Sequence, residues 1–469
     1  MMISTYDFGM IGLGVMGRNF LLNVADHGFS AAGLDLDSEK AAALEAEASG
    51  KPVKGTADTA TFVRMLKPPR KIMLLVPAGK AVDSVIASLL PHLEPGDLII
   101  DGGNSYFEDT NRRIEELKSK NILFMGMGVS GGSEGARRGP SIMPGGNSEA
   151  YRLVAPILEA VSAKVNGDPC VAHLGNTSAG HYVKMVHNGI EYGLMQLIAE
   201  AYDILKNIAG LDNKQLHTVF KDWNRGALQS FLIEITASIF LKADDQGKGW
   251  LLDKILDKAK QKGTGKWTSQ NAMDLGIPTP TIDAAVTMRG LSALKMERKM
   301  AAPHYTRAVE PLPLADKEQI IGQVGEALYF AFIVTYAQGM HQLTEASKEY
   351  GYELNLGTIA RIWRGGCIIR AALLEKMRQA YADQPELRNL LLSPAFHEPV
   401  LHGQHAARAI IKTAIDSGIP AMAFSSALHY FDAYRREQLP LNLVQAQRDF
   451  FGAHTYERVD RSGVFHTNW

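Results

Sequence analysis

Apolar and polar positions follow two different periods along the chain. Between residues 7 and 175, short apolar runs alternate with amphipathic segments, several of which end in glycine, as at Gly28, Gly50 and Gly96. We predict strands at 7–12, 31–34, 71–76, 98–100 and 122–125, separated by helices. This strand–helix repetition is typical of an α/β fold, here a Rossmann-type doubly wound parallel sheet covered on both faces.

A helical period dominates the rest of the chain. Apolar positions with helical spacing predict long helices at 181–208, 227–241, 319–350 and 356–381. We therefore expect three parts: a dinucleotide-binding domain at 1–178, an all-helical substrate and dimerisation domain at 179–436, and a C-terminal tail at 437–469. The tail is rich in aromatic residues, so we expect it to bury them on a partner subunit.

Composition excludes several classes of protein. The chain has 469 residues, 46% of them hydrophobic and 21% charged, and its formal net charge is −1, which gives no reason for overall attraction to nucleic acid or an anionic membrane. Its two cysteines lack CxxC spacing, which excludes a disulfide framework or a zinc cluster and fits a reducing compartment. The start has no basic segment and carries Asp7 in its apolar run, so we expect no signal peptide and a cytoplasmic protein.

A glycine motif follows the first predicted strand. GxGxxG alone is a weak signal, but here a strand precedes it, a helix follows it, and a second strand ends at Asp35. In this context the glycines permit a tight turn, close approach of the backbone to a pyrophosphate, and close helix packing. We therefore expect a dinucleotide, rather than a purely structural turn, to contact Gly12, Leu13, Gly14, Val15, Met16 and Gly17.

Two later glycine-rich segments, 101–105 and 126–132, are predicted to be turns after strands. Ligands of open α/β sheets bind beyond the carboxyl ends of the strands, where these turns would lie. Ser130, with Gly131 and Gly132, would present a hydroxyl and amide groups to a carboxylate. Each segment taken singly could equally be only a tight connection.

Four polar residues recur on one face of the helix predicted at 181–208. Lys184, His187, Asn188 and Glu191 stand at i, i+3, i+4 and i+7, and Tyr192 flanks them. Their neighbours are apolar, so this face is more than the solvated side of a surface helix; the structural alternative is a Lys–Glu pair beside a satisfied histidine. We expect burial to lower the pKa of the lysine toward neutrality, as a general base requires.

At these residues the chain closely resembles the 6-phosphogluconate dehydrogenase family. The segments HYVKMVHNGIEYG, DGGNS, GVSGG, GPSIMPGG, KGTGKWT, GCIIRA and QRDFFGAHTYERVD follow one another in family order between residues 9 and 469. The resemblance implies oxidative decarboxylation of 6-phosphogluconate to ribulose 5-phosphate and CO2 with a nicotinamide cofactor and without a metal. It also implies a homodimer in which the tail enters the partner's active site.

The resemblance further implies a role for each matching residue. Lys184 would take the proton of the substrate's 3-hydroxyl, and Glu191 would protonate C1 of the enediol. Asn104 would contact substrate and cofactor, and the carboxylate end would be held by Ser130, Gly131, Gly132, His187 and Asn188. The phosphate would be held by Tyr192, Lys262, Arg289, Arg448 and His454. Without the family, the last four would be read as surface, ion-pairing or packing residues.

The chain departs from the family pattern at two places that bear on the cofactor. The family's Asn-Arg-Thr or Asn-Arg-Ser, which holds the 2′-phosphate of NADP, is Asp35-Leu36-Asp37 here, and its Val-Lys-Ala-Gly is Val76-Pro77-Ala78-Gly79. Asp35 stands where an acidic side chain accepts hydrogen bonds from the ribose hydroxyls. We therefore expect NAD to be preferred, with NADP possible as the family habit.

Two other functions remain as alternatives. One is a β-hydroxyacid dehydrogenase acting on another substrate; such enzymes are usually much shorter and lack the proton donor and the phosphate-binding tail. The other is a non-catalytic cofactor-binding protein, against which the intact Lys184 and Glu191 argue.

Overall fold

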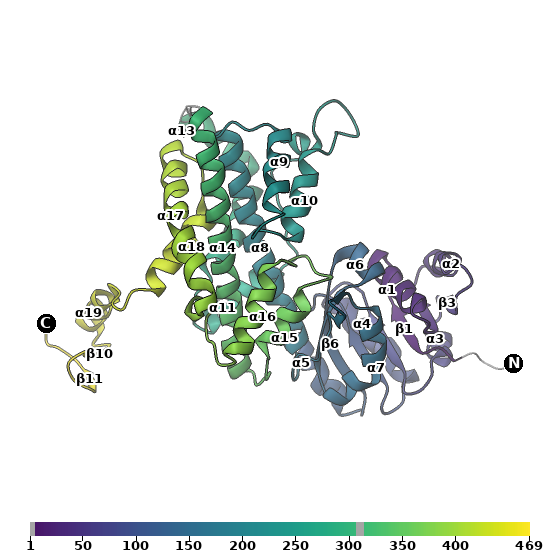
Figure 1. Cartoon of the computed structure of the whole chain (residues 1–469). Coiled ribbons are helices and arrows are strands. Elements are labelled where there is room, and N and C mark those ends of the chain that lie inside the picture. Colours follow the sequence, from purple (N-terminus) through teal and green to yellow (C-terminus); the bar gives the residue numbers. More distant parts are fainter. Residues whose placement is uncertain (1–4, 306–313) are drawn as a thin grey trace.

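The N-terminal part of the computed structural model, which describes residues 5–305 and 314–469, is built around one twisted sheet (Figure 1). Its strands are β1 (Phe8–Ile11), β2 (Ala31–Leu34), β3 (Val53–Thr56), β4 (Lys71–Leu74), β5 (Leu98–Asp101), β6 (Leu123–Ser130) and β7 (Ser141–Gly146). The intervening helices are α1 (Val15–Asp26), α2 (Ser38–Glu47), α3 (Thr59–Met65), α4 (Lys80–Leu89), α5 (Phe107–Lys118), α6 (Gly132–Arg138) and α7 (Ser148–Val161), with a 3-10 turn, η1 (Leu90–His92). A small hairpin, β8 (Lys164–Val165) and β9 (Asp168–Pro169), ends this part.

Strand order creates the place where a ligand can bind. The order is β3-β2-β1-β4-β5-β6-β7, so the chain moves outward from β1 in one direction and then from β4 in the other. Such a reversal opens a crevice beyond the carboxyl ends of the two central strands. Two apolar cores, one containing Phe20 and Leu158 and the other containing Phe62 and Leu117, cover the two faces of the sheet. The predicted doubly wound fold is therefore confirmed.

Three details of this domain differ from the prediction. Strand β3 was not predicted, because Val-Lys-Gly-Thr at a half-buried edge carries little apolar signal. Strand β7 was not predicted either, and it runs antiparallel to β6, because the seven-residue α6 between them is too short for a parallel crossover. Strand β6 continues to Ser130, so Gly126 and Gly128 lie within the strand and the prediction of a turn at 126–132 was wrong for 126–130.

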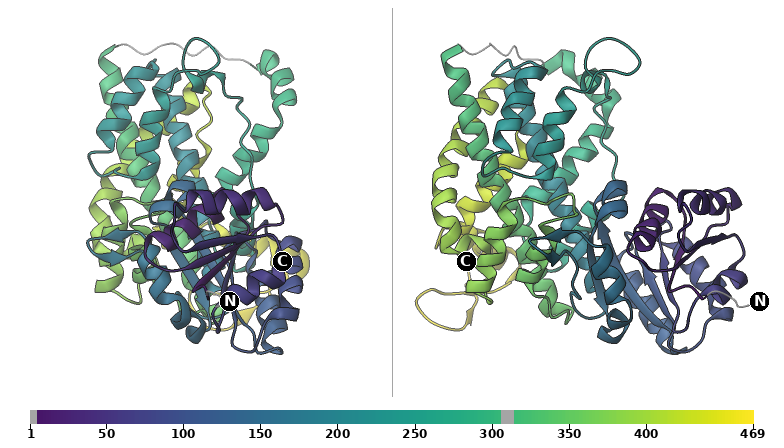
Figure 2. Two further views of the ribbon diagram at one scale, coloured as in Figure 1. Left: turned by 90° about the vertical axis from the view of Figure 1, so that its right-hand side faces the viewer. Right: turned by 45° about the vertical axis from the view of Figure 1, so that its right-hand side comes forward.

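The second part of the chain is a helical domain, as predicted (Figures 1 and 2). Its helices are α8 (Ala179–Asn207), α9 (Asn213–Trp223), α10 (Phe231–Phe240), α11 (Thr264–Asp274), α12 (Pro280–Ala293), α13 (Lys295–Tyr305), α14 (Leu314–Glu349), α15 (Leu356–Trp363), α16 (Leu373–Asp383), α17 (Pro394–Ser417) and α18 (Met422–Tyr434), with 3-10 turns η2 (Leu251–Lys254) and η3 (Leu390–Leu392). The helix predicted at 356–381 is divided into α15 and α16. Gly366, at φ 66°, interrupts it, and an ideal Cβ added there would lie 2.5 Å from the Gly139 carbonyl oxygen.

The long helices α8 and α14 form the centre of this domain. Helix α8 packs against α11, α12, α14 and α18, and α14 packs against α17. Within the described residues, α14 is the one helix long and apolar enough to cross a membrane, but 72% of its most apolar stretch is buried inside the protein. Core helices of globular domains share this property.

The N-terminal turn of α8 rests directly on the sheet. An ideal Cβ on Gly180 would lie 2.3 Å from the Met143 carbonyl oxygen and 2.4 Å from that of Gly126, and one on Gly145 would lie 2.1 Å from the Gly180 nitrogen. Only glycine allows backbones to approach so closely. As a result, the first turns of α8 stand over the carboxyl ends of β6 and β5.

The last part of the chain projects from the helical domain on the side opposite the sheet (Figures 1 and 2). It consists of α19 (Leu441–Gly452) and the hairpin β10 (Tyr456–Glu457) and β11 (Val464–Phe465). The buried carboxylate of Asp449 organises it by accepting hydrogen bonds from Thr455 N, Thr467 N and Trp469 Nε1. Phe450, Phe451 and Trp469 remain 68%, 72% and 58% exposed in the single chain.

Candidate active site

Helix α8 brings the predicted polar residues together at its contact with β6. The Lys184 Nζ lies 3.4 Å from His187 Nδ1, which is 3.1 Å from Asn188 Oδ1 and 3.9 Å from Glu191 Oε2. Lys184 and His187 are buried, whereas Glu191 keeps 21% of its side chain exposed. The Lys184 stem is fixed against the sheet, since an ideal Cβ on Gly128 would be 2.4 Å from Lys184 Cβ.

Burial shifts the pKa of each ionisable group in this cluster. Desolvation lowers the pKa of Lys184, and the charge of Glu191 opposes that shift. Desolvation also raises the pKa of Glu191, and here Lys184 and then Arg289 oppose the shift. Desolvation and the neighbouring Lys184 hold the pKa of His187 well below its usual value, so its imidazole is neutral. The shifts bring a base and an acid toward the range in which each can exchange protons near neutral pH.

Ser130 joins the cluster from the end of β6. Its hydroxyl lies 3.4 Å from His187 Nε2. Because Asn188 Oδ1 can only accept, the Nδ1 of His187 carries the proton in the tautomer that satisfies both contacts, and Nε2 accepts from Ser130. The adjacent Gly131 takes φ 123°, and Gly132 opens α6 with φ 63°. The Ser130 hydroxyl and the His187 imidazole thus extend the polar cluster from Lys184 to the end of β6.

The α15–α16 connection completes this side of the cluster, and the sequence reasoning assigned it no role. The ring of Trp363 contacts that of His187 edge-on at 5.4 Å between centroids. The thiol of Cys367 is buried close to Lys184 and Glu191, and this burial raises its pKa to about 12. Trp363 is 0% and Cys367 3% exposed, so this side of the cluster is closed to water. The segment GCIIRA was noted in the sequence, and the available signal was the glycine pair at 365–366, whose second member begins that segment.

Tyr192 and Arg289 lie together on the far side of Glu191. The guanidinium of Arg289 stacks over the Tyr192 ring at 3.5 Å, and its Nη1 donates to the carbonyl of Lys260. Both residues line a cavity of about 420 Å³. Gly265 of the KGTGK segment packs on the Tyr192 ring, which brings this segment to the site, while Lys262 itself is exposed.

Arg448 and His454 are not brought to this cluster within one chain. Both are exposed in the projecting tail, where Arg448 contacts Gln445 and His454 packs on Phe451. Asn104 is exposed beyond β5, in the turn that follows Asp101.

The residues predicted to hold the cofactor line the crevice beyond β1 and β4. Gly12, at φ 94°, makes the turn, Gly14 opens α1 with space where a Cβ would stand, and Gly17 packs on the Gly12 carbonyl. Val15 and Met16 begin α1, and Val76, Pro77 and Ala78 follow β4 with Pro77 and Ala78 exposed. This open cradle of glycine at a helix N-terminus fits a dinucleotide pyrophosphate.

The carboxylate of Asp35 is fixed at the edge of this crevice. It accepts hydrogen bonds from Leu13 N at 2.8 Å and Asp37 N at 3.1 Å. Burial opposes its charge, but the backbone donors of Asp37 and Leu13, with Lys40 at 3.4 Å, lower its pKa. Leu36 is 93% exposed and Asp37 caps α2.

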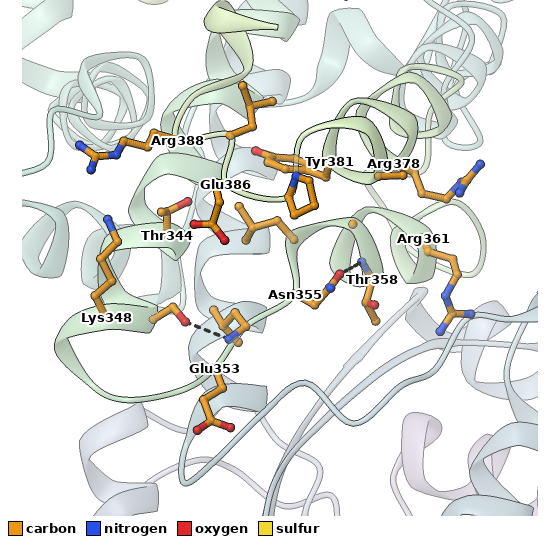
Figure 3. Close-up of a pocket in the computed structure, with 17 residues that line it drawn as sticks. Thr344, Lys348, Glu353, Asn355, Thr358, Arg361, Arg378, Tyr381, Glu386 and Arg388 are labelled. Atoms are coloured by element: carbon orange, nitrogen blue, oxygen red, sulfur yellow. Dashed lines mark hydrogen bonds between the residues drawn. The ribbon is translucent and has the colours of Figure 1, made fainter.

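A separate cavity of about 790 Å³ lies between α14, α15 and α16 (Figure 3). None of the predicted site residues lines it. It opens at the N-terminal end of α15, whose C-terminal end carries Trp363. No group of three or more His, Cys, Asp or Glu side chains arranged to hold a metal ion occurs in residues 5–305 and 314–469.

The chain is similar to known proteins over its whole length. A family model described as the NAD binding domain of 6-phosphogluconate dehydrogenase matches residues 7–175, and one described as the C-terminal domain of that enzyme matches residues 180–469. The chain is 54% identical over 468 residues to the NADP(+)-dependent, decarboxylating 6-phosphogluconate dehydrogenase of Bacillus subtilis, with 100% of both chains covered. It is 50% identical over 468 residues to the decarboxylating enzyme of Escherichia coli, again with 100% of both covered.

A solved structure extends the similarity to three dimensions. The 6-phosphogluconate dehydrogenase of Plasmodium falciparum, described in its apo form and in complexes with NADP+ and with 6-phosphogluconate, superposes with a TM-score of 0.95. Its sequence is 46% identical, and the match covers 99% of this chain and 100% of that one.

Substitution of Gly17 and of Gly14 in the cofactor turn should have different effects, the first on stability and the second on cofactor binding. In Gly17→Ala the new methyl would stand 1.9 Å from the Gly12 carbonyl oxygen, so we expect the melting temperature to fall by several degrees, corresponding to roughly 1–3 kcal/mol. In Gly14→Ala the methyl meets no protein atom within 4 Å, and the backbone (φ −62°) suits alanine. We expect unchanged stability but about tenfold weaker cofactor binding, measured by fluorescence titration. Unchanged cofactor binding in Gly14→Ala would contradict the assignment of this turn.

Proposed function

The chain belongs to the 6-phosphogluconate dehydrogenase family, and from this we propose that it converts 6-phospho-D-gluconate to D-ribulose 5-phosphate and CO2 while reducing a nicotinamide cofactor. The observation that carries the proposal is the buried Lys184, with Glu191 on the same helix face beside the Ser130 turn. Steady-state kinetics with 6-phosphogluconate, measuring reduced cofactor and CO2 together, test it. Equal amounts of the two products are expected.

In the first half of the reaction Lys184 acts as a base. A nicotinamide held in the crevice would supply the acceptor for the hydride that leaves C3 of the substrate. Lys184 takes the proton of the 3-hydroxyl as that hydride departs, which leaves a ketone at C3. Its lowered pKa makes the neutral amine available for this step. Ser130, His187 and Asn188, with the amides of Gly131 and Gly132, hold the carboxylate end, while Asn104 orients the reacting part of the substrate against the cofactor.

In the second half of the reaction Lys184 acts as an acid. The C1–C2 bond breaks, CO2 leaves, and the electron pair moves toward the keto oxygen, which receives the proton held by Lys184. Glu191 then protonates the substrate's former C2, which is C1 of the resulting enediol, while Lys184 takes back the hydroxyl proton and so leaves the ketone of ribulose 5-phosphate. Its raised pKa keeps a proton available for this transfer. The ammonium of Lys184 polarises the keto oxygen, so the mechanism requires no metal.

The phosphate of the substrate is bound between two subunits in this proposal. Tyr192 and Arg289 line the 420 Å³ cavity beside Glu191, and Lys262 is exposed and free to turn toward it. Arg448 and His454 come from the tail of a second chain in a homodimer. The support is that the tail is a compact unit with large exposed aromatic side chains and makes few contacts with its own helical domain.

For the cofactor we propose a preference for NAD over NADP, although the Bacillus subtilis relative is named as NADP(+)-dependent. The fixed carboxylate of Asp35 is able to accept from ribose hydroxyls and repels a 2′-phosphate of about −2 charge. Leu36 offers no charge to pair with such a phosphate. Lys40 pairs with Asp35 and Asp37 across this turn. Its ammonium can turn toward a 2′-phosphate instead, so some use of NADP persists.

The proposed compartment is the cytoplasm, in keeping with two buried free cysteines. A β-hydroxyacid dehydrogenase reaction on another substrate is less favoured, since the family models cover both domains and the tail.

We expect Lys184→Ala and Glu191→Ala each to lower kcat by at least ~100-fold, the usual contribution of a general base or acid. Activity of the unmodified enzyme should survive EDTA. Glu116→Ala serves as a control, because that exposed carboxylate lies on α5 away from the cluster. Turnover close to wild type in either active-site variant would contradict these roles.

The pH dependence of Glu191→Gln tests the interaction between Lys184 and Glu191, because the direction of the shift can be predicted. The charge of Glu191 raises the pKa of Lys184, so removing that charge lowers it. Because kcat/KM needs the neutral amine, it declines as the pH falls through this pKa. The acid limb of the residual activity should therefore move to lower pH than in the wild type. A shift to higher pH would show that Lys184 does not govern this limb.

We expect each active site to use a tail from the partner chain. Co-expressed Arg448→Ala and Lys184→Ala chains, each inactive alone, should recover about a quarter of wild-type activity, because half of the random dimers carry one intact site. Arg458→Ala is the matched control, since that tail arginine pairs with Asp460 and should leave activity unchanged. If purified mixed dimers recover nothing, the tail acts within its own chain.

We expect kcat/KM to favour NAD over NADP by ~100-fold, the effect of losing a charge-assisted pair and adding repulsion. Asp35→Asn combined with Leu36→Arg should reverse the preference. Glu39→Gln, which removes one nearby exposed charge, should leave the ratio within about twofold. A preference for NADP in the unmodified protein would mean that the 2′-phosphate is held by other residues.

A further inference from the structure

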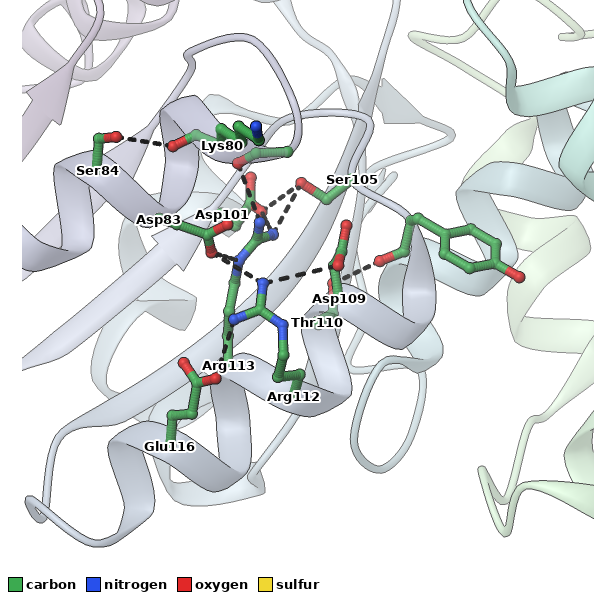
Figure 4. A network of polar contacts seen from close by, with 12 residues as sticks. Lys80, Asp83, Ser84, Asp101, Ser105, Asp109, Thr110, Arg112, Arg113 and Glu116 are labelled. Carbon is green, nitrogen blue, oxygen red and sulfur yellow. Dashed lines mark hydrogen bonds and ion pairs between the residues drawn. The ribbon is translucent and has the colours of Figure 1, made fainter.

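A buried arginine, Arg113 of α5, connects two turns of the ligand crevice (Figure 4). Its Nη2 donates to the carbonyl of Gly79, 3.2 Å away, in the turn after β4. Its Nη1 lies 3.4 Å from both Asp101 Oδ2 and Ser105 Oγ, in the turn after β5. Its Nε donates to Asp83 at 2.8 Å. One guanidinium, 1% exposed, therefore spans the end of the Val76–Gly79 turn and the turn that carries Asn104.

The carboxylate of Asp101 shapes the second turn from within. Its Oδ1 accepts from Gly103 N at 3.0 Å, and its Oδ2 accepts from the Ser105 hydroxyl at 2.6 Å. These bonds fix the residues on both sides of Asn104. Asp101 is itself 1% exposed, so its charge depends on Arg113 for compensation.

A third bond connects this turn to the helix of the reacting residues. The His181 Nε2 donates to the Asp101 carbonyl at 3.0 Å, since a carbonyl can only accept, and Nδ1 accepts from the Thr110 hydroxyl at 2.7 Å. His181 is buried, and desolvation lowers its pKa, which keeps this neutral tautomer. It lies three residues before Lys184, one turn earlier on the same face of α8.

We propose that Arg113 is a positioning residue for the reaction: it sets the cofactor turn, Asn104 and, through Asp101 and His181, the Lys184 helix in one relative geometry. Arg113, Asp101 and His181 are each only 1% exposed, so they act through the turns and the helix that they hold. Its effect is that hydride acceptor and base are aligned by the same buried network. The expected effect on kcat rests on the proposed function, whereas the expected effect on cofactor affinity requires only that the protein binds a nicotinamide cofactor.

The test compares Arg113→Ala with Arg112→Ala. Arg112 is the adjacent residue with the same charge; it pairs with Asp83, Asp109 and Glu116 but touches neither turn. For Arg113→Ala we expect about tenfold weaker binding of the reduced cofactor by fluorescence titration and about tenfold lower kcat, as for the loss of a charge-assisted hydrogen bond. For Arg112→Ala both values should stay within about twofold of the wild type, and millimolar guanidinium should restore activity to Arg113→Ala alone.

A second variant keeps the proposal testable if Arg113→Ala folds poorly. Arg113→Lys keeps the charge but has one ammonium where four contacts are needed, so we expect a folded protein with cofactor affinity still reduced severalfold. The proposal is overturned if Arg113→Ala or Arg113→Lys matches Arg112→Ala in both cofactor affinity and kcat, whatever its melting temperature. If the wild type does not turn over 6-phosphogluconate, the proposed function fails, while the cofactor titrations still decide the role of Arg113.

Discussion

The structure depends on the contact between the first turn of α8 and strands β6 and β7. Gly126, Gly145 and Gly180 let the helix and the sheet meet backbone to backbone. Because nothing separates them, the next turns of α8 stand over the carboxyl ends of the strands, where ligands of doubly wound sheets bind. The same contact buries Lys184 and His187, and burial causes their pKa shifts. Fold, domain junction and acid–base chemistry thus follow from one close approach.

The periodicity of the sequence was enough to predict those elements that are determined by their own local pattern. The central strands are short apolar runs, and the i, i+3, i+4, i+7 face of α8 is a property of helix geometry alone, so both were predictable. Strand β7 and the break between α15 and α16 were not, because each is dictated by a distant partner: β7 by β6 and α8, and Gly366 by Gly139. For the same reason Trp363, Cys367 and Arg113 were not assigned to the site.

Charge compensation is arranged differently at the two ends of the crevice. On the cofactor side, Asp101 and Arg113 form a permanent buried pair whose hydrogen bonds are nearly all satisfied. On the catalytic side, Lys184 is buried and Glu191 partly exposed, and the two oppose each other's pKa shifts without a direct hydrogen bond. Hydrogen bonds hold the first pair in one geometry, whereas the second pair has no mutual hydrogen bond to break when a proton moves. The first arrangement suits a scaffold and the second suits a reaction.

The packing of Lys184 against Gly128 also has an entropic consequence. A free lysine side chain loses up to about 2 kcal/mol of rotamer entropy when it is immobilised. Here the first carbons of the side chain already press on the strand, and His187 and Trp363 limit the space beyond them. Most of the ordering therefore takes place when the chain folds. Substrate meets an amine that has little freedom left to lose, so its binding energy can go into alignment for reaction.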